Sequence, residues 1–210
     1  MQKERVLVTG ASGFIGSNLL DYLLEKDYEV IGLSRQKNLP KIHPHLTWIR
    51  ALEELKHDRI DYVVNLAGES IAQGRWTDAR KQKLIASRVE MTTMLYQYLA
   101  KRNIKPKCII SGSAVGYYGI DPTEQWSECC NEQSAPQSIF MSELCQKWEQ
   151  ICTARHIAKY QNYSFRCGLW TWGWHFAANV VSDQNELMWA YRFGAATCGL
   201  GAYSRCAASD

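Results

Sequence analysis

The sequence lacks the features of membrane, secreted and disordered proteins. No apolar run reaches the roughly 18 residues that a membrane helix needs, so we expect no membrane partner. The chain passes from Met1 into a strand-like run within a few residues, which predicts that it has no signal peptide. A net charge of +3 over 210 residues is too small to favour nucleic-acid partners. Charged residues at 21% and hydrophobic residues at 46% exclude wholesale disorder.

Cysteine is not scarce, but no cysteine spacing matches a metal or redox motif. None of the eight cysteines forms a CxxC pair, and Cys129 and Cys130 are adjacent. His43 and His45 stand in a stretch that offers no third ligand, so we interpret it as a solvated loop. We therefore expect reduced thiols, a cytoplasmic location and no metal site.

Short apolar segments alternate with segments of helical periodicity through most of the chain. Helices are predicted from Phe14 to Lys26, over roughly 78–102 and over about 139–155. The alternation predicts βαβ units, and therefore a Rossmann-type, doubly wound parallel sheet with helices on both faces. The predicted strands are 5–9, 29–33, 46–49, 62–66, 108–111 and 163–167.

A glycine-rich turn lies directly between the first strand and the first helix. Residues 9–16 read TGASGFIG, with Gly10, Gly13 and Gly16 in a GxxGxxG pattern. The first glycine permits a tight turn, the second a close approach of the backbone to a pyrophosphate, and the third close helix–strand packing. The start of the helix then offers N–H groups to the phosphates. This context favours a dinucleotide site over a turn that binds nothing.

The end of the second predicted strand favours NADP over NAD. An acidic residue there would bind a ribose 2′-hydroxyl, as NAD requires. The chain has Ser34 and Arg35 instead, with Lys37 nearby, and a hydroxyl with a guanidinium suits a 2′-phosphate. The alternative is that Arg35 is an ordinary solvated cation.

These segments resemble the extended short-chain dehydrogenases/reductases. The resemblance is greatest to the branch named epimerase family proteins, which is similar to nucleotide-sugar epimerases, and it covers about residues 4–168. Further matching segments, in family order, are NLAGE at 65–69, RW at 75–76, SR at 87–88, SGSA at 111–114, GYYG at 116–119, LC at 144–145 and WE at 148–149.

The resemblance implies positions for the cofactor. It adds Phe14 and Ile15 to the three glycines of the turn as cofactor-binding residues. It also implies that Leu66 and Ala67 line the adenosine and ribose side of the cleft, and that Gly68 permits a close approach. Lys83 and Arg88 would be cofactor-side contacts, with solvated helix charges as the alternative.

The catalytic residues implied by the resemblance are only partly present. Ser113 matches the catalytic serine or threonine, although it could instead bond local backbone as a strand-ending serine. The superfamily's Tyr-x-x-x-Lys pair is missing, because Ile139 takes the tyrosine position and Glu143 the lysine position. Tyr117 or Tyr118 could replace the missing proton donor, and aromatic packing is the alternative for both.

The last part of the chain departs from the pattern. Four of the eight tryptophans lie between residues 170 and 210. Permissible codons for residues 168–208, read after dropping one base, give without a stop a string that resembles the family's continuation. We therefore predict a Rossmann domain over 1–168 and an out-of-frame, truncated tail over 169–210 that lacks the substrate domain. Sequencing the gene tests this hypothesis, because a single intact frame would contradict it.

Two functions follow as hypotheses. The first is an NADP-binding oxidoreductase or epimerase-like enzyme that acts on a small molecule, with a sugar nucleotide as one substrate class, and that is impaired in this form. The alternative is a non-catalytic NADP-binding protein or sensor. The missing Tyr-x-x-x-Lys pair favours the sensor, whereas Ser113 and the cofactor motifs favour the enzyme.

Overall fold

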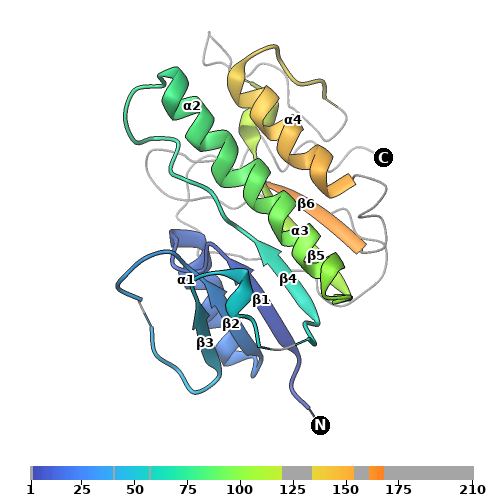
Figure 1. The fold of residues 1–210 in the computed structure, drawn as a ribbon. Helices are drawn as coiled ribbons and strands as arrows, with labels where there is room; N and C mark the ends of the chain where they lie inside the picture. The colour runs from blue at the N-terminus through green and yellow to red at the C-terminus, as the bar shows by residue number, and fades with distance from the viewer. Residues whose placement is uncertain (1, 40, 57, 120–133, 154–160, 168–210) are drawn as a thin grey trace, which may run out of the picture. The chain divides into compact units, whose positions relative to one another are not determined.

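A computed structural model describes residues 2–39, 41–56, 58–119, 134–153 and 161–167 (Figure 1). The predicted tail lies outside these ranges. The chain divides into two compact units, of which the first comprises 1–112 with 147–165 and the second 113–146 with 166–210. Within the described ranges, no helix is long and apolar enough to cross a membrane.

The strands form one sheet in the order β3-β2-β1-β4-β5-β6. Strands β1 to β5 pair in parallel, with β1 in the centre between β2 and β4. This parallel, helix-covered sheet confirms the predicted Rossmann-type fold class. The bounds are β1 (Arg5–Thr9), β2 (Glu29–Leu33), β3 (Leu46–Ile49), β4 (Tyr62–Asn65), β5 (Cys108–Ala114) and β6 (Gln161–Cys167).

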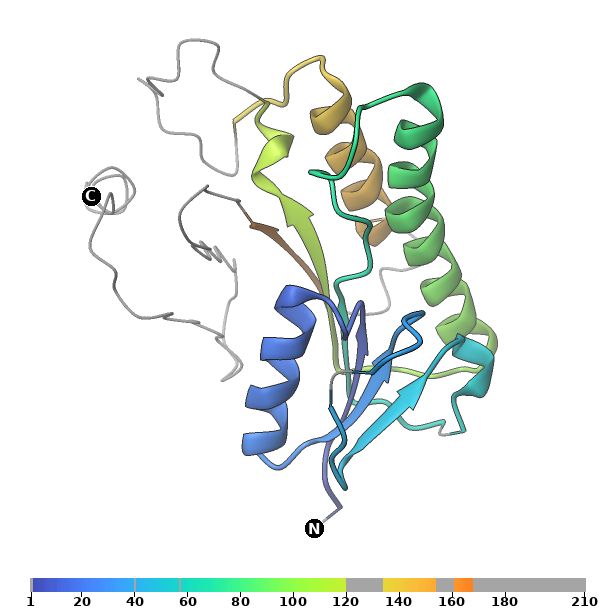
Figure 2. The same cartoon turned by 90° about the vertical axis from the view of Figure 1, so that its left-hand side faces the viewer.

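Helices cover both faces of the sheet in the first unit. Helix α1 (Phe14–Glu25) lies on one face, and α2 (Asp78–Ile85) and α3 (Met91–Lys101) lie on the other (Figure 2). The helix predicted over 78–102 is thus present, but a π-helical segment, Ala86–Glu90, separates its two α-helical parts. Helix α4 (Phe140–Thr153) lies in the described stretch 134–153.

The core of the first unit lies between the sheet and α3. Leu7 of β1, Val63 of β4 and Ile109 of β5 are fully buried, as are Leu95 and Leu99 of α3. These strand residues are apolar and mostly β-branched, as expected for strands buried on both faces. Burying one such side chain contributes about 1.5–3 kcal/mol to the hydrophobic stabilisation of the fold.

A buried polar network ties β4 to the helices at the sheet's centre. The Asn65 side-chain amide donates to Thr92 Oγ1 over 2.8 Å and to Ser111 Oγ over 3.1 Å. The Trp148 indole donates to the same Thr92 oxygen over 2.9 Å, which places this part of α4 beside α3. Because each buried donor finds an acceptor, the network avoids the desolvation penalty of an unpaired polar group.

In the second unit, the start of α4 packs on the turn that follows β5. Ser142 is buried, and its hydroxyl donates to the Gly116 carbonyl over 3.1 Å. A Cβ on Gly116 would lie 3.1 Å from Met141 Cε, so a larger residue would displace Met141. The one-turn helix Val115–Tyr117 is thereby fixed to α4.

Candidate functional site

The glycine-rich turn between β1 and α1 has the close backbone contacts that its sequence predicts. Gly10 has φ +65°, and a Cβ there would lie 2.6 Å from the Leu66 carbonyl oxygen. A Cβ on Gly16 would lie 2.3 Å from the Gly10 oxygen. Gly13 is exposed, and a Cβ there would make a single close contact, 3.1 Å from the Gly10 oxygen. Two glycines therefore serve the packing of the turn, while Gly13 keeps the outer face of the turn open.

The N-terminus of α1 opens at this turn without a side-chain cap. Gly13 is the N-cap residue, and the first turn of the helix contains no acidic residue. The first N–H groups of a helix have no partners within it, and the helix dipole favours negative charge at this end. Phe14 is 53% exposed and Ile15 is half-buried. The turn therefore offers N–H donors and positive potential to an anion.

At the end of β2, the two residues that predicted NADP differ in their surroundings. Ser34 is buried, and its hydroxyl lies 2.5 Å from the Ser12 hydroxyl of the glycine turn. Arg35 is exposed, and its guanidinium makes no hydrogen bond or ion pair with the residues that the structure describes. Lys37 is exposed two residues later. The serine therefore joins two loops, whereas the arginine is open to a ligand.

At the end of β4, Thr9 fixes the backbone that leads away from the strand. Its hydroxyl donates to Asn65 Oδ1 over 2.6 Å and accepts the N–H groups of Leu66 and Ala67, each over 3.2 Å. Leu66 and Ala67 are half-buried, and Gly68 is exposed. The segment predicted to line the adenosine and ribose side thus begins beside the glycine turn.

The two helix cations predicted as cofactor-side contacts lie in different surroundings. Lys83 is exposed on α2. Arg88 belongs to the π-helical segment, is buried, and donates to the Glu69 carbonyl over 2.9 Å. Its guanidinium carbon lies 5.5 Å from the Trp148 ring centre and 3.0 Å from where a Cβ on Gly68 would stand. Arg88 therefore supports the loop after β4 from within the protein.

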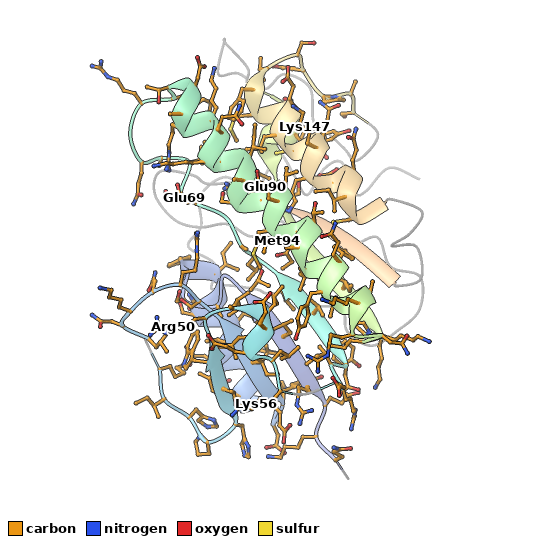
Figure 3. The ribbon with its side chains drawn as sticks, in the orientation of Figure 1. Arg50, Lys56, Glu69, Glu90, Met94 and Lys147 are labelled. Atoms are coloured by element: carbon orange, nitrogen blue, oxygen red, sulfur yellow. The ribbon has the colours of Figure 1, made fainter. Side chains whose placement is uncertain are left out.

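A second arginine contacts the same loop. Arg80 of α2 forms an ion pair with Glu69 and donates to the Ser70 carbonyl. The Glu69 N–H donates to Ser87 Oγ over 3.1 Å. Glu69, labelled in Figure 3, is therefore bound through its backbone and its carboxylate.

Sequence reasoning missed three residues that shape this region: Ser12, Arg50 and Arg80. Ser12 precedes Gly13 inside the motif, so its position next to a phosphate turn was a usable signal. Arg50 directly follows β3, and Arg80 bonds a backbone carbonyl. Contacts to backbone carbonyls carry no partner signal in a sequence, so these arginines resemble ordinary surface cations there.

The predicted catalytic residues lie in the second unit. Ser113 is buried near the end of β5, and the rings of Tyr117 and Tyr118 meet edge to face, with centroids 5.4 Å apart. Ile139 directly precedes α4 and Glu143 lies in its first turn, and the Glu143 N–H donates to the Ile139 carbonyl over 3.0 Å. A role for the tyrosines in proton transfer stays a prediction.

The structure offers no metal centre in the ranges that it describes. No group of three His, Cys, Asp or Glu side chains in those ranges could hold a metal ion. His45 Nε2 lies 2.9 Å from Lys3 Nζ, and the His43 and His45 rings are 5.7 Å apart between centroids.

Known proteins share both the sequence and the fold. A family model described as NAD dependent epimerase/dehydratase matches residues 6–160. An epimerase family protein of Staphylococcus saprophyticus is 34% identical over 151 residues, which are 70% of this chain and 49% of that protein. The chain therefore spans about half the length of the relatives that it matches.

Solved structures of related proteins have the same fold as this chain. The structure of the human epimerase family protein SDR39U1 with NADPH has a TM-score of 0.65 at 29% identity, over 81% of this chain and 56% of that chain. MoeE5 in complex with UDP-glucose and NAD gives a TM-score of 0.61 at 24% identity, over 77% of this chain and 53% of that chain. The second likeness bears on the fold alone.

Proposed function

Because the chain belongs to the NAD dependent epimerase/dehydratase family of extended short-chain dehydrogenases/reductases, we propose that its first unit binds NADP. We propose further that the protein is an oxidoreductase or epimerase-like enzyme by descent. Its substrate is a small molecule, and sugar nucleotides are the first class to test. When bound, the nicotinamide supplies a hydride acceptor or donor.

The observation that carries the proposal is the geometry of the turn at residues 10–16. Gly10 and Gly16 pack against backbone so closely that a Cβ on either would clash, while Gly13 and the uncapped start of α1 face outward. A turn that served packing alone would have no need for an open second glycine at an uncapped helix end. The arrangement suits a pyrophosphate bound by backbone N–H groups.

The preference for NADP rests on the loop after β2. Residues 34–50 contain four lysines and arginines and no acidic residue. A carboxylate that would bind a ribose 2′-hydroxyl is therefore absent from this stretch of sequence. The Arg35 guanidinium, which has no polar partner within the described ranges, suits a 2′-phosphate. The human relative, whose structure was solved with NADPH, supports the same preference.

For catalysis, Ser113 would bond a substrate oxygen, and Tyr117 or Tyr118 would donate the proton. Neither Ile139 nor Glu143 replaces the family pair, because isoleucine holds no transferable proton and a carboxylate does not lower a phenol pKa by its charge. This departure supports the second candidate function, a non-catalytic NADP-binding protein or sensor.

Titration of the 210-residue protein with NADPH, followed by nicotinamide fluorescence, tests the proposal. We expect NADPH to bind at least about tenfold more tightly than NADH, which corresponds to one good charged contact to the 2′-phosphate. Absence of binding by both cofactors would refute both candidate functions. Equal affinities would refute the NADP preference alone.

A turnover panel of sugar nucleotides and carbonyl compounds then separates the enzyme from the sensor. Binding of NADPH with neither net oxidation of the cofactor nor epimerisation of any panel member favours the sensor. If turnover is found, the Tyr117→Phe/Tyr118→Phe double variant should lose it. Full activity in that variant would exclude the tyrosines as proton donors.

A further inference from the structure

The loop that follows β2 is held in one shape by contacts from two neighbouring segments. The Ser34 N–H donates to the Ile49 carbonyl of β3 over 3.0 Å. The Ser34 hydroxyl meets the Ser12 hydroxyl over 2.5 Å and accepts the Gln36 N–H over 3.2 Å. Residues 34–36 are therefore fixed to both β3 and the glycine turn.

Arg50 holds the other end of this loop. Its Nη1 donates to the Gln36 carbonyl over 3.1 Å, and its Nη2 donates to the Lys37 carbonyl over 3.3 Å. The Arg50 N–H in turn donates to Glu54 Oε2 over 3.1 Å, which fixes the base of the side chain. A guanidinium presents two parallel N–H donors in a rigid plane, so it can hold two successive carbonyls at once.

Arg35 lies between these fixed points, and its guanidinium makes no hydrogen bond or ion pair with any residue that the structure describes. Its neighbour Ser34 is buried and bonded, and the carbonyls of Gln36 and Lys37 are bonded to Arg50. The backbone on both sides of Arg35 is thus ordered before any ligand binds. Ordering a loop costs conformational entropy, so a loop that is already ordered binds its ligand more tightly.

We propose that Arg50 is a positioning residue for NADP selectivity: it shapes the loop 34–37 so that Arg35 meets the 2′-phosphate of the cofactor. This inference rests on the proposed function and adds to it a residue outside the glycine turn and the Ser-Arg pair. Ser12 acts with Arg50 by holding Ser34 from the opposite side. Arg50 itself bonds the loop, so its effect on the phosphate is indirect.

The test compares Kd values for NADPH and NADH in Arg50→Met, Arg50→Lys and a matched control. Lys56→Met is that control, since Lys56 is also exposed and lies in the same part of the first unit (Figure 3). We expect Arg50→Met to weaken NADPH binding about tenfold and NADH binding less than about twofold. Lys56→Met should change neither Kd, although it removes the same formal charge.

Arg50→Lys separates positioning from direct charge. A lysine keeps the charge but is a flexible point donor, so it should fail to restore the two carbonyl contacts and should resemble Arg50→Met. Restored NADPH affinity in Arg50→Lys would show a charge effect and overturn the positioning role. Equal losses for NADPH and NADH would also overturn it, because a general structural defect does not discriminate between the cofactors.

Ser12→Ala provides an independent check if the Arg50 variants fold poorly. It removes one hydroxyl from the opposite side of the loop and should also weaken NADPH binding selectively, by about threefold. A Ser12→Ala variant with unchanged selectivity would contradict the inference. If the unmutated protein prefers NADPH and all variants keep that preference, this inference fails and the proposed function stands. If the unmutated protein binds neither cofactor, both fail.

Discussion

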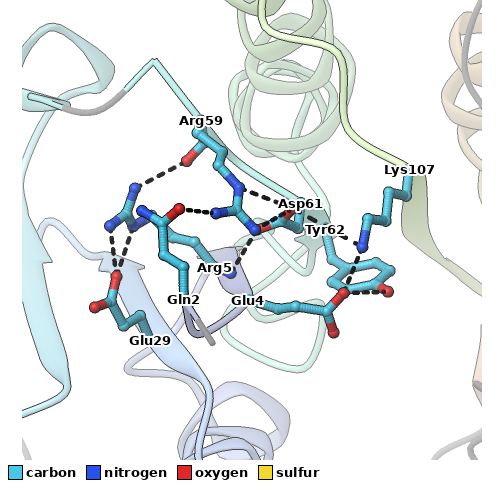
Figure 4. A network of polar contacts seen from close by, with 8 residues as sticks. All are labelled: Gln2, Glu4, Arg5, Glu29, Arg59, Asp61, Tyr62 and Lys107. Atoms are coloured by element: carbon cyan, nitrogen blue, oxygen red, sulfur yellow. Dashed lines mark hydrogen bonds and ion pairs between the residues drawn. The ribbon is translucent and has the colours of Figure 1, made fainter.

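The two ends of the parallel sheet differ in how their charged side chains are paired. At the amino ends of the strands, charged side chains pair with one another (Figure 4): Arg5 with Glu29, Arg59 with Asp61, and Lys107 with Glu4. At the carboxyl ends, the turn after β1 offers backbone donors, and the Arg35 guanidinium after β2 bonds none of the side chains or carbonyls in the part of the chain that the structure describes. At the amino end the charges connect strands. At the carboxyl end Glu69 and Arg80 pair with each other after β4, whereas we propose that the segments after β1 and β2 bind the cofactor.

Asp61 shows how complete the pairing at the amino end is. Its carboxylate is buried and accepts the Arg5 N–H over 2.9 Å and two Arg59 donors over 3.1 and 3.2 Å. Lys107 Nζ lies 4.0 Å away. This network connects β1 with the segments that begin β4 and β5. We therefore expect mutations at the amino end to change stability and mutations at the carboxyl end to change binding.

The largest effect should come from the glycine turn, where the two kinds of change can be separated. Gly16→Ala puts a Cβ against backbone at 2.3 Å, so we expect it to destabilise the fold by about 3 kcal/mol and to lower the Tm. Gly13→Ala makes one contact at 3.1 Å and should nearly keep the Tm while weakening NADPH binding more than about tenfold. Calorimetry and fluorescence titration measure the two quantities.

A similar decrease in Tm in Gly16→Ala and Gly13→Ala would contradict the separate roles of the two glycines, because the turn would then serve packing alone. Unchanged NADPH affinity in Gly13→Ala would show that the pyrophosphate binds elsewhere.

Asp61→Ala should have the next largest effect, at the amino end. It leaves the part-buried Arg5 N–H and two Arg59 donors without their acceptor, so we expect a loss of about 2 kcal/mol in the free energy of unfolding. Urea denaturation measures it. The Kd for NADPH should stay unchanged below the Tm. Asp58→Ala, which breaks an exposed pair with Arg102, is the control and should leave stability nearly unchanged.

The smallest effect should be a loss of stability at alkaline pH. Burial raises the pKa of Cys108 to about 11 and also raises the pKa of Tyr62, so the fold favours their neutral forms. These groups therefore contribute stability below the pH at which they ionise in the unfolded chain, and it is lost as the pH rises through the folded pKa. The Tm should fall between about pH 9 and 11, and less steeply in Cys108→Ala. Equal slopes in the two proteins would exclude Cys108 as a cause.

The sequence predicts the strands better than it predicts the long helix. Strands β1, β2 and β3 have the predicted bounds, because each is a short apolar run. Nothing in the sequence predicted the π-helical segment Ala86–Glu90, because its residues fit an α-helix equally well. The fifth strand continues to Ala114, beyond the predicted end at Ser111, because pairing in the sheet overrides the weak strand propensity of serine and glycine.

In the candidate site, too, residue type and spacing predict some features and not others. The tight turn at Gly10 was predictable because it depends on residue type and spacing, whereas the role of Arg35 stays a prediction. Arg50 was not, because its partners are two backbone carbonyls that any residues at 36 and 37 would provide. Contacts of this kind depend on how the chain folds, which residue type and spacing do not reveal.

The π-helical segment also restricts how this helix can change length. A π turn holds one residue more than an α turn, so deleting one residue within 86–90 would restore a continuous α-helix. The deletion would leave α2 and α3 facing nearly as they do now, because the wide turn already holds the residue that is lost. Arg88 would then still have to reach the loop after β4, and Thr92 would stay in the buried network. A one-residue deletion here that spares Arg88 should therefore be tolerated better than one inside α3, where it would rotate the rest of the helix by about 100°.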